Sequence, residues 1–399
     1  MDTGTSQLLA VDRRPNVAST RLKLIQLCGM AAFALTICLA FPTARAQAQM
    51  HWPPAQNDLN TLVQRFRPYL KFSTGSRQES RPVTWQYLYA NSTLMNGSTV
   101  VVPLGGLAGS GASQALNCSN LTKGDPNSPT GLSCRLKIDE THNAQYGEPW
   151  PQAEAGDGLY ARATYLANVT TQVPAVNLVN IEYWVLLGFN VGPSVGIDDH
   201  QGDLIGVQVV YDHASDKLVR VTFSEHGTSL IMFDLVHSAA PKNATLDGKN
   251  DQGVHITQAA CQVEAQDKGF YSGGTGMTAG GDHHLFLVRD PVTNRCEHLA
   301  LYLEHGSHEP WPNQSGWFVA VAAHNGDDVS YLPTTAHVLG PEDAPFVNFG
   351  GNLGDSDGPA AISRHRMWLG YNPHANPADR DPYVDEGSLK WLPTLTASE

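Results

Sequence analysis

The sequence predicts an all-β protein, a β-sandwich or jelly roll with long glycine- and proline-rich loops and a short N-terminal helix. Thirty-seven glycines and 25 prolines punctuate the chain, and long stretches with the 3.6-residue spacing of helices are hard to find. Short apolar runs recur at the spacing typical of β-sandwiches. The predicted strands are 181–190, 204–212, 217–227, 283–290, 298–306 and 317–324.

One short helix is expected in the segment DLNTLVQRFRPYL. Four apolar residues fall on one face at helical spacing: Leu59, Leu62, Val63 and Phe66. Asp58 stands at the expected cap, and Pro68 ends the helix because proline cannot continue the backbone hydrogen bonds.

A hairpin is predicted from 204–212 and 217–227, joined by the polar turn DHASDK. The second strand alternates in polarity, which places every second side chain on the same face. The residues expected to face the core are Val219, Val221 and Phe223. The residues expected on the opposite face are Arg220, Thr222, Ser224 and His226.

The first 46 residues have the features of a secretory signal peptide. A basic start precedes an apolar stretch from Leu24 to Phe41, and Ala44 and Ala46 form a small-residue cleavage pattern. We therefore expect a secreted or periplasmic protein with no stable membrane span after signal cleavage. A retained anchor stays open as an alternative, because the stretch is close to the ~18 residues that cross a bilayer.

Composition divides the chain into four parts. Residues 1–46 are the predicted signal peptide, and 47–160 hold the short helix and a loop-rich segment. Residues 161–340 carry most of the predicted strands and form the central β-sandwich with the candidate site. Residues 341–399 are a loop-rich C-terminal extension. At 399 residues, one large domain and two smaller ones are both possible.

Cysteine count and net charge limit the possible functions. Four cysteines follow the signal peptide, an even number that indicates disulfides in an exported protein: Cys118, Cys134, Cys261 and Cys296. Three pairings are possible, and proximity favours Cys118 with Cys134 and Cys261 with Cys296. The net charge of −13 argues against nucleic acid as a partner, because phosphate binding needs clustered Lys and Arg.

Histidines and carboxylates gather in three segments, at 198–203, 224–229 and 303–312, where strands meet loops. Imidazole and carboxylate ligands suit Mg²⁺, Ca²⁺, Mn²⁺ or Zn²⁺. The residues of these segments, His200 and Asp203 in the first among them, are therefore candidate metal ligands. As an alternative, such residues satisfy backbone donors in turns without any ion.

Five segments occur in an order that resembles the vacuolar protein sorting-associated protein 62 family: YWVLLGFN, HQGDLIGVQVVYD, LVRVTFSEHG, LALYLEHGSHEPWP and FVNFGGNLGD. The resemblance spans roughly residues 60 to 370. The family's His-x-Gly-Asp-Trp-Glu segment is matched by His200, Gly202 and Asp203, and Leu204 and Ile205 stand at its Trp and Glu positions. The family has no well-established activity, so this resemblance implies a fold more than a function.

The family's remaining polar segments match two further places in the chain. Its Ser-x-His segment corresponds to Ser224 and His226, and its Gly-Ser-His or His-Gly-His segment corresponds to His305, Gly306 and His308. All of these positions lie at the ends of predicted strands.

A more distant resemblance is to the necrosis- and ethylene-inducing toxins. Their Gly-His-Arg-His-Asp-Trp-Glu stretch binds a divalent cation beside a sandwich and engages sphingolipid sugars. His200 and Asp203 have the matching spacing, and Asn190 falls near the upstream carboxylate ligand. Because Ile205 replaces the Glu, the resemblance implies that a cation would draw on other oxygens, with Asp199 in support.

Three functions follow as hypotheses. The first is a secreted, divalent-cation-assisted binder of a cell-surface glycan or lipid head group. The second is a metal-assisted hydrolase or lyase in which His226 or His308 acts as the base. The third is a secreted structural scaffold without a metal.

Overall fold

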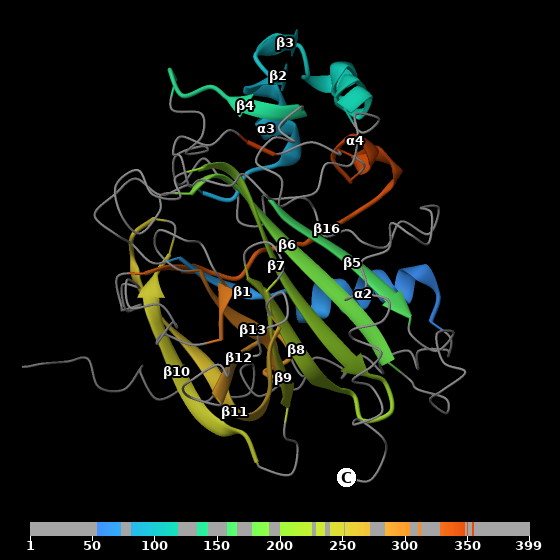
Figure 1. Ribbon diagram of the computed structural model, residues 1–399. Coiled ribbons are helices and arrows are strands. Elements are labelled where there is room, and N and C mark those ends of the chain that lie inside the picture. The colour runs from blue at the N-terminus through green and yellow to red at the C-terminus, as the bar shows by residue number, and fades with distance from the viewer. Residues whose placement is uncertain are drawn as a thin grey trace, which may run out of the picture. The chain divides into compact units, whose positions relative to one another are not determined.

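The computed structural model (Figure 1) describes a subset of the chain, all of which belongs to one compact unit, Trp52–Glu399. The described residues are 54–72, 81–118, 134–142, 158–165, 178–190, 200–225, 229–235, 240–250, 252–271, 284–303, 310–312, 328–347, 349 and 353–354. The predicted signal peptide in residues 1–46 and the predicted strand 317–324 lie outside them.

Thirteen strands form one hydrogen-bonded sheet, which confirms the predicted all-β class. The strands are β1 (Tyr69–Phe72), β5 (Leu159–Tyr165), β6 (Leu178–Asn190), β7 (His200–Asp212), β8 (Lys217–Glu225), β9 (Ser229–Leu235), β10 (Lys242–Lys249), β11 (His255–Tyr271), β12 (His284–Arg289), β13 (Cys296–Leu303), β14 (Pro310–Trp311), β15 (Val329–Tyr331) and β16 (His337–Val338). The neighbours run β10-β15-β1-β13-β12-β11-β9-β8-β7-β6-β5-β16, and β14 pairs with β13.

Strand β11 belongs to two parts of this sheet. Its first half pairs with both β10 and β12, so the path from β10 through β15, β1, β13 and β12 returns to β11 as a closed ring of strands. Its second half, from Ala265 to Tyr271, pairs with β9 and starts an antiparallel meander through β8, β7, β6 and β5. Figure 1 shows the long meander strands, in green, beside the yellow and orange strands of the ring.

A second, three-stranded sheet carries the remaining strands, in the order β3-β2-β4. These strands are β2 (Ser92–Asn96), β3 (Thr99–Val102) and β4 (Cys134–Ile138). The helical elements are α2 (Gln56–Phe66), α3 (Trp85–Ala90), η1 (Gly109–Cys118), η4 (Pro341–Asp343) and α4 (Ala344–Val347). An aromatic cluster joins this region to β5 and β6, with Trp85, Tyr160, Trp184 and Phe346 among its buried members.

Helix α2 confirms the predicted N-terminal helix and its apolar face. The buried residues are the four that the spacing selected: Leu59, Leu62, Val63 and Phe66. The cap differs from the prediction. Ala55 is the N-cap, and Asp58 lies in the first turn, where its carboxylate accepts the Ala55 N–H at 3.1 Å. The helix packs on the meander, since the Tyr183 hydroxyl donates to the Val63 carbonyl at 2.7 Å.

The predicted hairpin of β7 and β8 is confirmed, but β8 is buried on both faces. Val221 and Phe223 face the core as expected. Arg220 and Thr222, expected on the face away from the core, are only 1% and 5% exposed. The Arg220 guanidinium donates to the Asp234 carboxylate of β9 at 2.6 Å, and this ion pair compensates for the desolvation of both charges.

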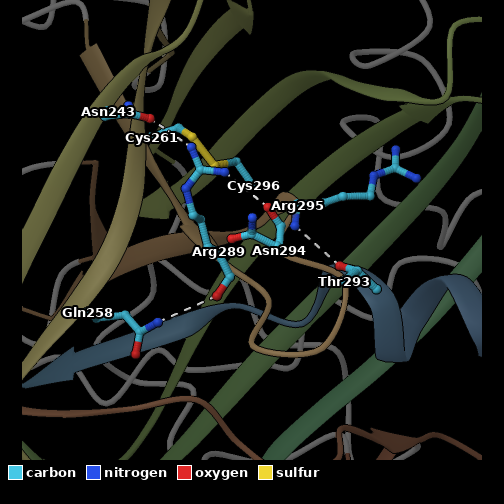
Figure 2. The surroundings of a disulfide bond; sticks show 8 residues. All are labelled: Asn243, Gln258, Cys261, Arg289, Thr293, Asn294, Arg295 and Cys296. Atoms are coloured by element: carbon cyan, nitrogen blue, oxygen red, sulfur yellow. Dashed lines mark hydrogen bonds between the residues drawn. A yellow bond between two sulfur atoms is a disulfide. The ribbon is translucent and has the colours of Figure 1, made fainter. Parts of the chain in front are cut away.

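The disulfide between Cys261 and Cys296 confirms one of the two pairings that proximity favoured. It links β11 to β13 across β12, which lies between them in the sheet (Figure 2). Nearby, Arg289 donates to the Asn243 side chain at 2.8 Å and to the Asn294 carbonyl at 3.0 Å. The side chains of Cys118 and Cys134 lie outside the described part of the chain, so their pairing stays a prediction.

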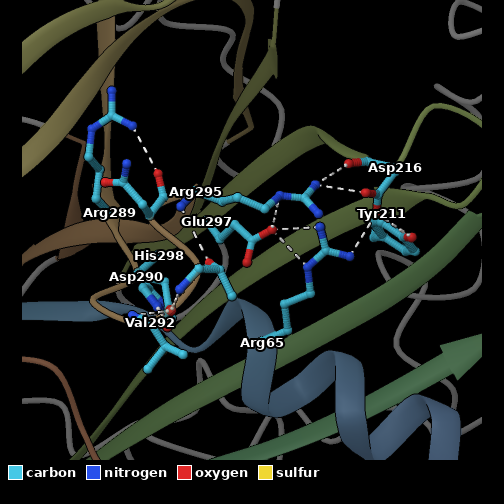
Figure 3. A network of polar contacts seen from close by, with 11 residues as sticks. Arg65, Tyr211, Asp216, Arg289, Asp290, Val292, Arg295, Glu297 and His298 are labelled. Carbon is cyan, nitrogen blue, oxygen red and sulfur yellow. Dashed lines mark hydrogen bonds and ion pairs between the residues drawn. The ribbon is translucent and has the colours of Figure 1, made fainter. Parts of the chain in front are cut away.

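A network of charges fastens α2 to the meander and to the ring (Figure 3). Arg65 of α2 contacts Glu297 of β13 at 2.6 Å and Asp216, in the turn between β7 and β8, at 2.7 Å. Arg295 contacts the same two carboxylates, at 2.8 and 2.7 Å. Burial raises the pKa of Asp216, but hydrogen bonds from Arg65, Arg295 and Tyr211 outweigh it and bring the pKa down to about 2.

We expect removal of the Cys261–Cys296 disulfide to lower the free energy of unfolding by about 2–4 kcal/mol, because the bond restricts the unfolded chain. The variant is Cys261→Ser combined with Cys296→Ser, and the measurement is urea unfolding at neutral pH. Peptide mapping without reductant should recover the linked pair from the wild-type protein. Equal unfolding midpoints for variant and wild type would contradict a stabilising role.

The charge network predicts acid sensitivity. Because the folded-state pKa of Asp216 is about 2 and an ordinary Asp titrates near ~3.9, its contribution is complete above pH ~4 and is lost as the pH falls towards ~2. Asp216→Asn, which keeps a side chain suited to the backbone φ of 54°, should flatten stability against pH in this window. Urea midpoints at pH 5 and pH 3 measure the difference, and high salt should shrink it. Parallel pH profiles for variant and wild type would exclude this role.

Candidate functional site

The pairing of β6 with β7 brings three of the four predicted metal ligands to the same end of two adjacent strands. Asn190, the last residue of β6, is the cross-strand partner of His200, the first residue of β7, and Asp203 is the partner of Leu187. The structure describes the backbone of these residues. Their side chains, and the whole of Asp199, lie outside the described part of the chain.

Gln201 holds this end of β7 against the smaller sheet. Its side chain is fully buried and pairs with β4 as a neighbouring strand would: the Ile138 N–H donates to Oε1 at 2.7 Å, and Nε2 donates to the Ile138 carbonyl at 3.2 Å. Nε2 also donates to the Glu140 carboxylate. Because both polar atoms of the amide are satisfied, the backbone at His200 and Gly202 has a fixed support.

Two glycines let a second segment lie directly on this strand end. Gly202 has a φ of 68°, and a Cβ there would lie 2.1 Å from the Leu353 carbonyl oxygen. A Cβ on Gly354 would lie 1.8 Å from the Gln201 carbonyl oxygen. Only glycine permits this approach. Gln201 and Gly202 are therefore in backbone contact with Leu353 and Gly354, which are far away in the sequence.

The two predicted catalytic histidines, His226 and His308, lie outside the described residues. The adjoining strands β8 and β13 end at Glu225 and Leu303. The role of both histidines as a base stays a prediction.

A second group of potential ligands was missed by the sequence analysis. His337, Glu342 and Asp343 each offer one ligand atom, and these atoms lie within 4.8 Å of one another, so the group could hold a metal ion. His337 begins β16, and the two carboxylates lie in η4. The sequence GPED resembles an ordinary helix start with proline and acidic residues in the first turn, which gave no reason to connect it with a histidine upstream.

Asp343 is held in place by three hydrogen bonds. Its Oδ1 accepts the Trp85 indole N–H at 2.8 Å, and its Oδ2 accepts the Gly340 N–H at 2.8 Å. The His337 Nε2 lies 2.8 Å from Oδ2. The His337 ring meets the edge of the Tyr160 ring at a centroid distance of 5.4 Å. The buried carboxylate and the exposed imidazole are thus both oriented by neighbours.

Comparison with known proteins returns no match, whether to family models, to curated proteins or to solved structures. Among the helices that the structure describes, none has the length and apolar character needed to cross a membrane.

The contact of Gly202 with Leu353 predicts a specific cost of substitution. Gly202→Ala combines a strained φ with a backbone clash, whereas Gly97→Ala shares the strain, at a φ of 57°, with nothing within 4 Å of the new methyl group. We expect Gly97→Ala to lower the free energy of unfolding by about 1 kcal/mol and Gly202→Ala to lower it by about 1–3 kcal/mol more. Urea unfolding measures both, and equal losses would refute the close contact.

Proposed function

We propose that the protein is a secreted, divalent-cation-assisted binder of a cell-surface glycan or lipid head group. The observation that supports this most is the register of β6 and β7, in which Asn190 and His200 are direct partners at the strand ends. The Cα atoms of such antiparallel partners are about 4.5–5.5 Å apart, a spacing from which two side chains can reach one ion. Asp203 lies three positions further along β7, after Gly202, whose φ of 68° interrupts the regular alternation of faces between His200 and Asp203. Asp199 directly precedes His200 in the chain.

The residue types at this strand end suit a divalent cation. An amide oxygen, two carboxylates and an imidazole provide oxygen-rich coordination with one nitrogen, which fits Mg²⁺, Ca²⁺, Mn²⁺ or Zn²⁺. The backbone support from Gln201 and from the Gly202–Gly354 contact would keep the ligands in place. Ligands that are already held in place reduce the loss of conformational entropy that accompanies ion binding.

The charge of the protein supports a bridging role for the cation. With a net charge of −13, the chain repels anionic head groups unless a bound cation lies between the two. A cation with open coordination positions binds sugar hydroxyls and phosphate oxygens alike. Binding requires only the ion and its open positions. Hydrolysis would also require a positioned base.

We expect Asp203→Ala to weaken divalent-ion binding by at least ~10-fold while the protein stays folded, because the substitution removes a ligand and leaves the backbone pairing of β7 unchanged. Elemental analysis of the purified protein and thermal melts with and without chelator test this. A saturating ion, at 100 times its Kd, stabilises the folded state by about 2.7 kcal/mol, and a 10-fold loss of affinity reduces this to about 1.4 kcal/mol. Chelation should therefore lower the wild-type melting temperature more than that of the variant.

Glu264→Gln is the matched control, because it removes one exposed carboxylate from β11, away from this site. It should bind the ion as the wild type does. Glycan arrays and vesicles with defined head groups, each with and without the ion, then test the ligand class. If chelation changes neither the melt nor ligand binding, the proposed function is wrong.

A further inference from the structure

Among the buried carboxylates of the described residues, Asp343 differs from the others in its charged partner. These carboxylates are Glu182, Asp234, Glu297, Asp328 and Asp343. The first four each contact an arginine or a lysine, through the pairs Arg162–Glu182, Arg220–Asp234, Arg65–Glu297 and Lys71–Asp328. Asp343 is fully buried, and within the described part of the chain its ion-pair partner is His337, whose side chain is 43% exposed.

This difference is physically significant because a buried carboxylate without a positive partner is strongly unfavourable. The Trp85 and Gly340 N–H groups that bond to Asp343 are neutral donors. An imidazole supplies a positive charge only when it is protonated. A metal ion ligated by the same imidazole and the same carboxylate would supply that charge at neutral pH.

Glu342 adds a second carboxylate to the same place. Its side chain folds back over Gly340, where a Cβ would lie 2.5 Å from one carboxylate oxygen and 2.7 Å from the other. Glycine at this position therefore makes room for Glu342 beside Asp343. The carboxylate is exposed and thus free to adjust its position towards an ion.

We propose that His337, Glu342 and Asp343 form a binding site for a first-row transition ion of the Zn²⁺ type, separate from the site at the ends of β6 and β7. The facing atoms of His337 and Asp343 are 2.8 Å apart, and all three ligand atoms lie within 4.8 Å. Ligand atoms around a tetrahedral Zn²⁺ with bonds of ~2.1 Å are about 3.4 Å apart, so small side-chain movements would close the shell.

The ligand chemistry selects the ion. Three protein ligands that include an imidazole nitrogen suit a four-coordinate Zn²⁺ or one of its neighbours in the first transition row, whereas Mg²⁺ and Ca²⁺ take six or more ligands, nearly all of them oxygen. Three protein ligands leave one position of a tetrahedral ion open. Because His337 and Glu342 are exposed, this open position would be accessible to solvent. Trp85 and Gly340 act as the outer partners that orient the buried ligand, as is usual around metal sites.

The proposed ion would also fasten the C-terminal part of the described chain. β16 pairs with β5, where His337 is the partner of Tyr160, while Asp343 bonds to Trp85 of α3. One ion would join β16 and η4 at the boundary between the large sheet and the aromatic cluster. Zn²⁺ should therefore raise the melting temperature.

The test is isothermal titration of the purified protein with Zn²⁺, using a protein made without a histidine tag and stripped with chelator. His337→Ala should remove one Zn²⁺ equivalent, and Glu342→Gln should weaken that equivalent by more than the ~10–100-fold that loss of an outer partner causes. His255→Ala, which removes an exposed histidine from the start of β11, should leave the titration unchanged. Mg²⁺ should not compete.

Two further measurements separate this site from the one in the proposed function. Asp203→Ala should keep the Zn²⁺ equivalent that His337→Ala loses, so either site can fail without the other. The imidazole ¹H–¹⁵N resonances of His337, assigned by comparison with His337→Ala, should shift when one equivalent is added. Identical Zn²⁺ stoichiometry and affinity for wild type and His337→Ala would overturn the proposal.

Discussion

Burial of both faces of the meander is the constraint on which the rest of the structure depends. An antiparallel sheet with one wet face can place charged side chains in water, but β6, β8 and β9 have charged residues on covered faces. Arg220 is 1% exposed, and Asp234 is 8% exposed. Each such charge requires an opposite charge on a neighbouring strand, since an unpaired buried ion destabilises the fold by several kcal/mol. Strand register and charge pairing therefore depend on each other.

The sequence predicted those elements whose signal is local. The apolar face of α2, the β7–β8 hairpin and the Cys261–Cys296 disulfide follow from spacing within a few dozen residues. Strands β10 and β11 were missed because their sequences, KNATLDGK and HITQAACQVEAQDKGFY, are polar and lack a clear apolar alternation. Their extended conformation comes from neighbours on both edges of β11, which is a tertiary effect that propensity does not capture.

The same distinction between local and long-range signals applies to the two candidate sites. The segment HQGD was identified as a source of ligands from its own residue types. The backbone register of the structure then places Asn190 opposite His200. Nothing local marks Asp343 as a buried carboxylate. Its burial depends on Trp85, which donates to it from 258 positions away in the sequence. The same holds for the contact between Gly202 and Leu353, which two separate glycine-containing segments form only after folding.

One stretch of chain makes both the contact of Asp343 with Trp85 and the contact of Leu353 with Gly202. The segment that begins at β16 continues through η4 and α4, where Phe346 packs against Trp85 and Tyr160, and it reaches Gly202 through Leu353 and Gly354. Packed interiors transmit displacement because they have few voids. The buried cluster that contains Trp85, Tyr160, Phe346 and Leu353 is therefore the packed region that both contacts share, and it fixes η4 and the Gly202 end of β7 to the same core.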